Sequence, residues 1–396
     1  MIERKEYLNT LLSLKDKDII KVVTGIRRSG KSTLLLMFRD ELRRQGVSDE
    51  QIIFINLEDG DFREIQTSEA LFTTIKTHLK KGKKNYVCID EVQNVTDFPK
   101  AVDWLYADKN IDLYLTGSNA FLLSSDIATL LSGRYVEIKM MPLSFKEYTS
   151  AFPSNENSAK LFMRYLTEGS FPGILQFERE QDRKAYLEGL TNTILVKDII
   201  TRTNISNPSM LRSVIEYMFQ NIGNCCSASN ISHAMASMGR KISEPTVSSY
   251  VEALCDSFVL YQAKRYDVKG KKMLESLSKY YVADIGLRYY LLGSSHTDIG
   301  HILENIVYLE LVRRGFDVHI GKVYQTEVDF IVTTPDGTEY YQVAQTVMNQ
   351  DTLQRELAPL EAIRDNNQKY LLTMDYVPPT SYNGIKQRNL VEWLLE

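Results

Sequence analysis

The sequence predicts an α/β fold for the N-terminal part of the chain, with short strands forming a parallel sheet. Two observations support this prediction. Short apolar runs of high β propensity alternate with segments whose apolar residues recur at helical spacing. The first run also leads into a glycine-rich loop that is followed at once by a helical segment, an order typical of phosphate-binding α/β domains.

The size and composition of the chain indicate a globular protein of several domains. Its 396 residues exceed what one ordinary hydrophobic core organises, so we expect two or more domains. Hydrophobic residues make up 43% and charged residues 25%, which are ordinary values for a folded protein. A net charge of -4 excludes a basic coat over the whole surface and leaves open a local basic patch.

Neither membrane insertion nor zinc binding is predicted. Charged residues interrupt every long apolar run, including the one at the N-terminus, so we expect no membrane span, no signal peptide and a cytoplasmic location. The four cysteines and five histidines do not show the spacings of a zinc site. We therefore interpret the cysteines as small apolar residues that stay reduced.

The glycine-rich loop has the pattern G-x-x-x-x-G-K-[ST] between a strand at 19–24 and a helix. Its two glycines allow backbone N–H groups to turn inward around phosphate oxygens. The lysine of the pattern supplies a charge to the β and γ phosphates, and the serine hydroxyl is placed for Mg²⁺. The predicted nucleotide-binding residues are Gly25, Ile26, Arg27, Arg28, Ser29, Gly30, Lys31, Ser32 and Thr33.

Two acids at the end of a later strand are the candidates for metal binding and catalysis. The apolar run 85–89 ends in Asp90 and Glu91. Ligands of open α/β sheets bind at the carboxyl ends of the strands. We expect Asp90, with Ser32, to hold Mg²⁺ and Glu91 to polarise the attacking water.

Three further strands complete the predicted sheet. One lies at 52–57, between the loop and the acidic pair, and another at 112–116, followed by Gly117, Ser118 and Asn119. Ser118 and Asn119 are candidates for contact with the γ phosphate or the water. The last strand, 135–139, follows Arg134, which either stabilises transferred charge or forms a structural ion pair.

These motifs together resemble those of the AAA+ ATPases, and specifically a prokaryotic group of predicted ATPases with a distinctive C-terminal region. The matching stretches are GIRRSGKST, CIDEVQ, LTGSNA, LSGR and MPLSFKEY, in that order. The resemblance implies ATP as the nucleotide and Mg²⁺ as the metal. It also implies that Arg134 acts across a subunit boundary, and hence a homo-oligomer. The absence of an N-K-x-D motif agrees with adenine rather than guanine.

Changes in sequence pattern divide the chain into four predicted domains. The polar stretch FPSNENS marks the first boundary, and helical periodicity follows it. The predicted domains are a P-loop AAA+ domain (1–155), a helical lid or linker (156–205), a winged-helix domain (206–292) and a nuclease-like α/β domain (293–396).

The winged helix is predicted from three helices followed by a hairpin. The helices span 210–222, 228–238 and 244–258, and strands at 259–263 and 279–282 flank a basic turn at 264–272. The third helix carries Glu244, Glu252 and Asp256, whose charges oppose contact with DNA. DNA binding and protein contact therefore both stay open for this domain.

The C-terminal segment is similar to the PD-(D/E)xK nucleases but lacks half of their functional groups. Glu304 and Asp329 match two of the acids of that pattern. The positions of the second carboxylate and the lysine carry Gln342 and Ala344. We expect an inactive nuclease-like domain, since an amide is a poor substitute for a carboxylate on a hard cation, although Lys322 could replace the missing lysine.

Three functions remain open on the sequence alone. The first is an AAA+ ATPase that acts as a molecular switch on DNA or on an unidentified protein partner. The second is an ATPase coupled to a metal-dependent nuclease. The third is a module that binds ATP without hydrolysing it. The acidic pair after the third strand favours the first.

Overall fold

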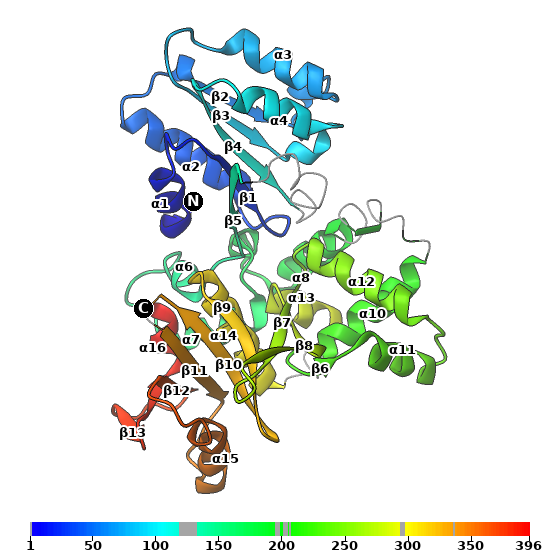
Figure 1. Cartoon of the computed structure of the whole chain (residues 1–396), viewed down its shortest axis with the longest axis vertical. Helices are drawn as coiled ribbons and strands as arrows, with labels where there is room; N and C mark the ends of the chain where they lie inside the picture. Colours follow the sequence, from blue (N-terminus) through cyan, green and yellow to red (C-terminus); the bar gives the residue numbers. More distant parts are fainter. Residues whose placement is uncertain are drawn as a thin grey trace. The chain divides into compact units, whose positions relative to one another are not determined.

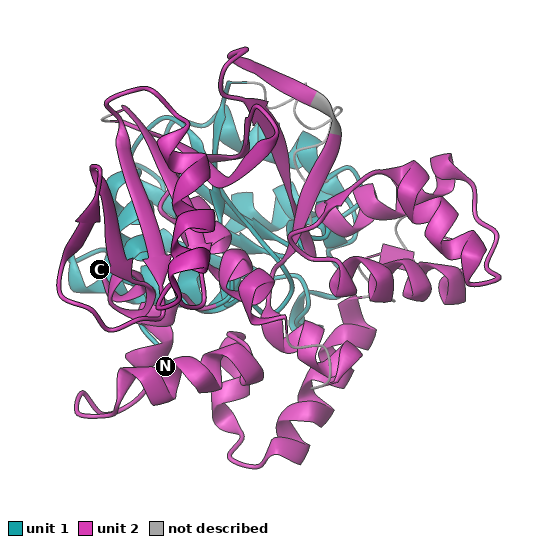
Figure 2. Ribbon diagram, turned by 90° about the horizontal axis from the view of Figure 1, so that it is seen from below, with its two compact units in different colours: residues 1–142, 256–258 teal, residues 143–255, 259–396 magenta. Residues whose placement is uncertain are grey.

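The structure is a computed structural model that describes residues 2–118, 133–194, 199–200, 205, 207–293, 298–335 and 337–396. The chain forms two compact units, coloured separately in Figure 2. The first unit comprises residues 1–142 with 256–258, and the second comprises residues 143–255 with 259–396. Each unit has its own sheet.

The first unit contains a five-stranded, entirely parallel sheet in the order β2-β3-β4-β1-β5 (Figure 1). Because all strands run the same way, their carboxyl ends share one edge, where ligands of open α/β sheets bind. The strands are β1 (Ile20–Thr24), β2 (Ile52–Asn56), β3 (Asn85–Asp90), β4 (Ile111–Gly117) and β5 (Tyr135–Lys139). The parallel sheet predicted from the sequence is confirmed.

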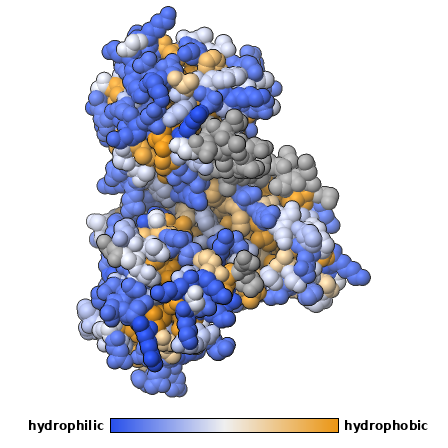
Figure 3. Space-filling model, viewed as in Figure 1, coloured by the Kyte–Doolittle hydropathy of each residue, from blue (hydrophilic) through white to orange (hydrophobic). Residues whose placement is uncertain are grey.

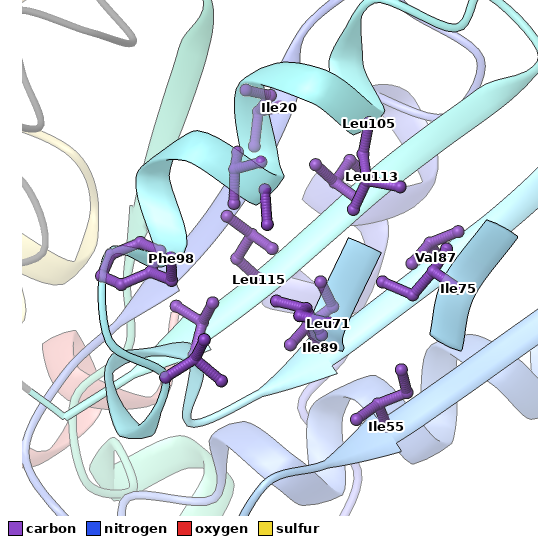
Figure 4. Close-up of a cluster of buried hydrophobic side chains, with 14 of the residues drawn as sticks. Ile20, Ile55, Leu71, Ile75, Val87, Ile89, Phe98, Leu105, Leu113 and Leu115 are labelled. Atoms are coloured by element: carbon purple, nitrogen blue, oxygen red, sulfur yellow. The ribbon is translucent and has the colours of Figure 1, made fainter. Parts of the chain in front are cut away.

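Helices cover both faces of this sheet, so its central strands are buried on both sides. On one face, α3 (Ser68–His78) and α4 (Phe98–Tyr106) pack against alternate strand residues, as Figure 4 shows for Val87, Ile89, Leu113 and Leu115. On the other face, α1 (Lys5–Ser13) and α2 (Lys31–Arg44) cover the intervening positions. Near-continuous apolar runs such as 85–89 follow from this double burial.

One charged residue lies within the buried part of β1. Lys21 is fully buried and forms an ion pair with Asp112 at the start of β4. The Asp112 carboxylate also accepts hydrogen bonds from the Tyr114 hydroxyl at 2.8 Å and the Asp16 amide at 2.9 Å. The buried charges are thus paired and hydrogen-bonded, as a low-dielectric interior requires.

The second unit begins with helices. The stretch MPLSFKEY contains a capping box, in which the Ser144 hydroxyl accepts from the Glu147 amide and the Glu147 carboxylate accepts from the Ser144 amide. The helices are α6 (Phe145–Thr149), α7 (Ser158–Glu168), α8 (Glu180–Thr193), α10 (Pro208–Gln220), α11 (Ala228–Ser237), α12 (Glu244–Asp256), α13 (Ile285–Leu292), α14 (Ile299–Arg313), α15 (Gln350–Glu361) and α16 (Leu390–Leu395).

A nine-stranded mixed sheet runs through the second unit in the order β13-β14-β12-β11-β10-β9-β7-β8-β6 (Figure 1). Its strands are β6 (Cys225–Cys226), β7 (Leu260–Asp267), β8 (Lys272–Val282), β9 (Asp317–Val323), β10 (Thr326–Thr334), β11 (Gly337–Ala344), β12 (Gln368–Thr373), β13 (Thr380–Tyr382) and β14 (Ile385–Asn389). The hairpin of β7 and β8 joins the C-terminal strands through parallel pairing of β7 with β9.

This sheet continues across the boundary predicted at 292/293. The predicted winged-helix and C-terminal segments therefore share one sheet, and the two compact units divide at 142/143. The hairpin strands are also longer than predicted and extend into the basic stretch 264–272. The pairing of β7 with β9 is a contact between distant parts of the chain, which a local sequence pattern does not report.

The surface of the first unit is mostly hydrophilic on the face seen in Figure 3. In the part of the chain that the structure describes, no helix has both the length and the apolar character needed to cross a bilayer.

Candidate nucleotide site

The loop after β1 is fixed by a close approach of two strands. Gly25 has φ +146°, and a Cβ atom placed there would lie 2.0 Å from the carbonyl oxygen of Met140, which follows β5. Any side chain at this position would separate β1 from the end of β5. The first glycine of the motif is therefore required by packing, in addition to any role in phosphate binding.

The second glycine starts α2. Gly30 is the N-cap residue and adopts φ 107° and ψ 17°, a left-handed conformation that favours glycine. The first N–H groups of α2 therefore point toward the loop, where the helix dipole favours an anion. The sequence places Lys31 and Ser32 in this first turn.

Lys31 follows the last glycine of the loop, and its side chain folds back into the loop. Its side chain is buried, and its ammonium group donates to the carbonyl oxygens of Gly25 at 2.9 Å and Ile26 at 3.3 Å. It also lies 3.7 Å from the Glu91 carboxylate. The structure thus places the loop lysine beside the predicted catalytic acid.

Ser32 and Asp90 meet at the same edge of the sheet. Asp90 ends β3 and is 1% exposed, and its carboxylate accepts a hydrogen bond from the Thr116 hydroxyl and lies near the Ser32 hydroxyl. Burial raises the pKa of the Asp90 carboxyl above its usual range, although the Thr116 and Ser32 hydroxyls act to lower it. A nearby cation would favour the charged form, which is the form that binds Mg²⁺.

Thr116, near the end of β4, connects the two acids. Its hydroxyl donates to the Asp90 carboxylate and accepts from the Glu91 amide at 2.9 Å. Glu91 adopts φ 54°, a left-handed conformation that is uncommon for a residue with a side chain. The Thr116 contact thus helps to hold a strained backbone that turns the Glu91 side chain away from that of Asp90.

Gln93 extends this network to Ser118. Its side-chain amide donates to the Glu91 carboxylate and lies 3.3 Å from the Ser118 hydroxyl. Ser118 is fully buried at the end of β4. Asn119, the other predicted contact to the γ phosphate, lies outside the described residues.

The other loop residues have individual roles in the structure. Ile26 is fully buried, and Arg27 forms a 2.8 Å ion pair with Glu58. Arg28 is exposed and adopts φ 67°. Ser29 is buried and Thr33 is half-buried on the first turn of α2.

Arg134 lies away from these residues. It precedes β5, and its carbonyl oxygen accepts from the amide of Ile20 at the start of β1, so it lies at the amino edge of the sheet. Its guanidinium group is 2.6 Å from Asp103 of α4, and its side chain is 48% exposed. The structure therefore does not bring Arg134 to the nucleotide site of its own chain, and a role in a neighbouring subunit stays a prediction.

The N-terminal segment braces the loop, which the sequence analysis missed. Arg4 is 2% exposed, and its guanidinium group donates to the carbonyl oxygens of Ser29 at 2.9 Å and Met141 at 2.8 Å. The Met141 amide also lies 3.3 Å from the Tyr7 hydroxyl. Thr116 and Gln93 were missed as well. Thr116 is two residues before Ser118, and Gln93 is two residues after Glu91, so their nearness in sequence to predicted site residues could have indicated them.

The residues present fit a nucleotide phosphate with Mg²⁺. The loop backbone forms a cradle in which side chains at both glycines are disfavoured. Two buried polar atoms near the cradle, Ser29 Oγ and Gln93 Oε1, have no hydrogen-bond partner among the described residues. Such atoms are rare in folded proteins and mark a place where a ligand or water binds. Ser32 and Asp90 supply the hard oxygen ligands that Mg²⁺ prefers.

The structure also shows where the predicted DNA-contacting residues lie. The turn between β7 and β8 carries Lys269 and Lys271, and the ammonium group of Lys269 is 4.6 Å from the ring centre of Tyr324, which is 59% exposed. These side chains line a cavity of about 690 Å³ that also includes Arg364. On α12, the Glu244 carboxylate accepts from the Ser229 hydroxyl at 2.8 Å.

The predicted nuclease-like residues come together in the second unit. The Val343 amide donates to Asp329 at 2.8 Å, and the Asp329 amide donates to the side-chain oxygen of Gln342 at 3.3 Å. The Glu304 carboxylate contacts the ammonium group of Lys279, a residue of β8 that the sequence analysis did not select. No group of three or more His, Cys, Asp or Glu residues within the described ranges could hold a metal ion.

Comparisons with known proteins agree with the fold of the first unit. An AAA domain family matches residues 17–149, and a domain of unknown function, DUF8612, matches residues 159–298. An uncharacterized protein of Haemophilus influenzae is 38% identical over 100% of this chain and 99% of its own length. An uncharacterized protein of Methanocaldococcus jannaschii is 30% identical over 87% of this chain and 79% of its own.

A solved structure has a similar fold over most of the chain. The Walker-type ATPase of Pyrococcus abyssi superposes with a TM-score of 0.51 at 17% identity and covers 74% of this chain and 96% of its own. At this identity the likeness concerns the fold alone.

The contact between Gly25 and Met140 gives a prediction for the site. Gly25→Ala places a methyl group against a backbone oxygen, so the loop or the end of β5 must shift. We expect a loss of about 1–3 kcal/mol in stability, as for other overpacked sites, together with a loss of ATP binding. Thermal unfolding without nucleotide and titration with ATP measure the two effects.

Gly60→Ala is the matched control, because Gly60 lies in the same unit and a Cβ atom there meets nothing within 4 Å. Wild-type stability and ATP affinity in Gly25→Ala would contradict the packing argument.

Proposed function

This chain belongs to one protein family with the uncharacterized proteins of H. influenzae and M. jannaschii and contains an AAA domain, and on that premise we propose that it is a Mg²⁺-dependent ATPase. In this proposal ATP binds at the carboxyl edge of the parallel sheet of the first unit. Hydrolysis changes the nucleotide-bound state of the chain, and the chain thereby acts as a molecular switch on DNA or on a protein partner.

One observation carries the proposal. Three separate segments, the start of α2, the end of β3 and the end of β4, bring Lys31, Ser32, Asp90, Glu91 and Thr116 together through hydrogen bonds and close ion pairs. A site that only bound phosphate would need the loop and the helix terminus. Glu91, the acid beside the loop lysine, is not needed for phosphate binding. It is the kind of group that hydrolysis requires to activate the attacking water.

The residues divide the chemical work between them. The loop amides and Lys31 hold the β and γ phosphates and stabilise the charge on the transferred group. Ser32 and Asp90 hold Mg²⁺, which neutralises phosphate charge when bound. Glu91 accepts a hydrogen bond from the attacking water and takes its proton, while Gln93 and Ser118 orient the carboxylate and the water.

Arg134 has a proposed role only in an oligomer. Its position at the amino edge of the sheet, half exposed, leaves it available to an adjacent subunit, where it would stabilise the transferred phosphate. The ion pair with Asp103 is the structural alternative, and it holds Arg134 against α4.

The second unit is the proposed site of partner contact. The order α10, β6, α11, α12, β7 and β8, with β6 paired to β8, supports a winged helix. Lys269, Lys271 and Lys272 at the tip of the hairpin favour contact with the phosphates of DNA. The acids of α12 instead favour contact with a protein through that helix.

Measurement of phosphate release tests the proposed activity. We expect Glu91→Gln to retain ATP binding but to lower the hydrolysis rate by about 10²–10⁴-fold, the range that a positioned general base contributes. Lys31→Ala should lose ATP binding itself, because it removes the charge that contacts the phosphates. Glu64→Gln, which changes an exposed acid, is the control and should hydrolyse ATP as wild type does.

The outcomes separate the open hypotheses. Equal, near-zero phosphate release from wild type and Glu91→Gln, with ATP bound by both, would show a module that binds ATP without hydrolysis. Wild-type turnover by Glu91→Gln would show that a different residue activates the water.

A second prediction concerns DNA. If the hairpin binds phosphates, changing Lys269, Lys271 and Lys272 to Glu should weaken binding to duplex DNA. It should also reduce the slope of log K against log salt by about 0.9 for each phosphate that the variant no longer neutralises. Fluorescence anisotropy with a labelled duplex at several salt concentrations measures both quantities.

The charge change needs a matched control. Lys80, Lys81 and Lys83 are exposed lysines of the first unit, and their triple change to Glu alters the net charge equally. The hairpin would be excluded as the DNA-binding element by either of two results: both triple variants lose duplex binding equally, or both bind the duplex as wild type does.

A further inference from the structure

A cluster of three carboxylates lies inside the second unit, away from the nucleotide loop in the sequence. It consists of Glu304 on α14 and of Glu327 and Asp329 on β10, and we call it the carboxylate cluster. Glu304 is 6% exposed. Glu327 and Asp329 are half-buried. The buried Glu304 carboxylate needs a cation close by, since an unpaired buried charge is strongly unfavourable.

The cation is supplied by the chain itself. Lys279 of β8 is 5% exposed, and its ammonium group lies 2.9 Å from Glu304 and 2.7 Å from Glu327. The Tyr281 hydroxyl, two residues along the same strand, donates to the same oxygen of Glu304 at 2.5 Å. Two groups of one strand thus converge on the carboxylate of α14.

A second basic residue also faces the carboxylate cluster. Arg265 of β7 lies 3.8 Å from Glu327, so two basic residues face the three acids of the cluster. Burial, together with the charge of Glu304, raises the pKa of Asp329 well above its usual range. Burial opposes the charge of Lys279, but Glu304, Asp329 and Glu327 together raise the pKa of its ammonium group.

The neighbouring residues are also arranged for a cluster without metal. The side chain of Gln342 accepts from the Asp329 amide and donates to Glu356 at 2.9 Å. A carboxylate at this position could not donate to Glu356 and would repel it. Ala344, two residues further along β11, packs in an apolar cluster with Val328 and Leu371.

We propose that Lys279 is the built-in cation of the carboxylate cluster and occupies the place that a divalent metal ion would need. The cluster then binds no metal in the native chain, and removal of the ammonium group opens a divalent-cation site at Glu304 and the neighbouring acids of the cluster. The same contacts fasten β8 of the hairpin to α14 and β10. This inference is independent of ATP hydrolysis in the first unit.

The Lys279 ammonium group leaves no room for a metal ion among these oxygens. A divalent cation takes oxygen ligands at about 2.0–2.6 Å and binds six or more of them. The Lys279 nitrogen already lies within hydrogen-bond distance of two carboxylates of the cluster, and a metal ion among the same oxygens would lie against it. Lys322 was the alternative source of the lysine that the nuclease pattern lacks. It is opposite Glu327 in the sheet register, but the ammonium group in contact with Glu304 is that of Lys279.

Titration with Mn²⁺ tests the proposal on the full-length chain without nucleotide. Wild type and Glu304→Gln should bind Mn²⁺ alike, because in both proteins the Lys279 ammonium group occupies the place that a metal ion would need. Lys279→Met should gain one Mn²⁺ site per chain and a higher unfolding temperature in Mn²⁺, and the double variant Lys279→Met/Glu304→Gln should lose both gains. Any Mn²⁺ bound at the nucleotide site is common to all four proteins and cancels in the comparison.

Lys264→Met is the matched control, because it removes an exposed lysine from the adjacent strand β7. It should behave as wild type. If Lys279→Met is unfolded when isolated, Mn²⁺ should restore its circular dichroism spectrum, whereas Lys279→Met/Glu304→Gln should not respond.

Two results would overturn the proposal. One is a Mn²⁺ site in wild type that Glu304→Gln abolishes, which would make the native cluster a metal site. The other is a Lys279→Met protein whose Mn²⁺ binding or folding in Mn²⁺ does not differ from that of Lys279→Met/Glu304→Gln.

Discussion

The hydroxyl group of Thr116 is the interaction on which the nucleotide site depends. It donates to Asp90 and accepts from the amide of Glu91, so it fixes the end of β3 against the end of β4. Without this hydroxyl, Asp90 would lose a donor, and the left-handed backbone of Glu91 would lose the acceptor that holds its amide. Because Thr116 holds the backbone turn between Asp90 and Glu91, the side chains of these two acids can point in different directions and take different roles.

The loop and the acidic pair were predictable because their requirements are local. Gly25, Gly30 and Lys31 are set by backbone conformation and by the first turn of a helix, which a short pattern records. Asp90 and Glu91 follow from a strand ending at the ligand-binding edge. Arg4 was not predictable, because it reaches the loop from another part of the chain and no spacing rule describes that contact.

The same limit explains the differences in the second unit. The three helices and the hairpin of the predicted winged helix followed from sequence pattern. The pairing of β7 with β9 joins segments that are more than fifty residues apart, so the predicted boundary at 292/293 crosses a continuous sheet. Lys279 had no signal in the sequence, since a lysine in an amphipathic strand ordinarily faces water. Only the fold places it among buried acids. Lys21 in β1 is a parallel case, with Asp112 as its partner.

The central claim is that the Thr116 hydroxyl organises a site for hydrolysis, and the rate of phosphate release by Thr116→Val at saturating ATP tests it most directly. Valine preserves the shape but leaves Asp90 and the Glu91 amide without this partner, a loss worth about 1–3 kcal/mol. We predict a rate about 10–100-fold below wild type with ATP still bound, and near-normal turnover for Thr116→Ser, which keeps the hydroxyl. Wild-type turnover by Thr116→Val, or equal loss in both variants, would contradict the account.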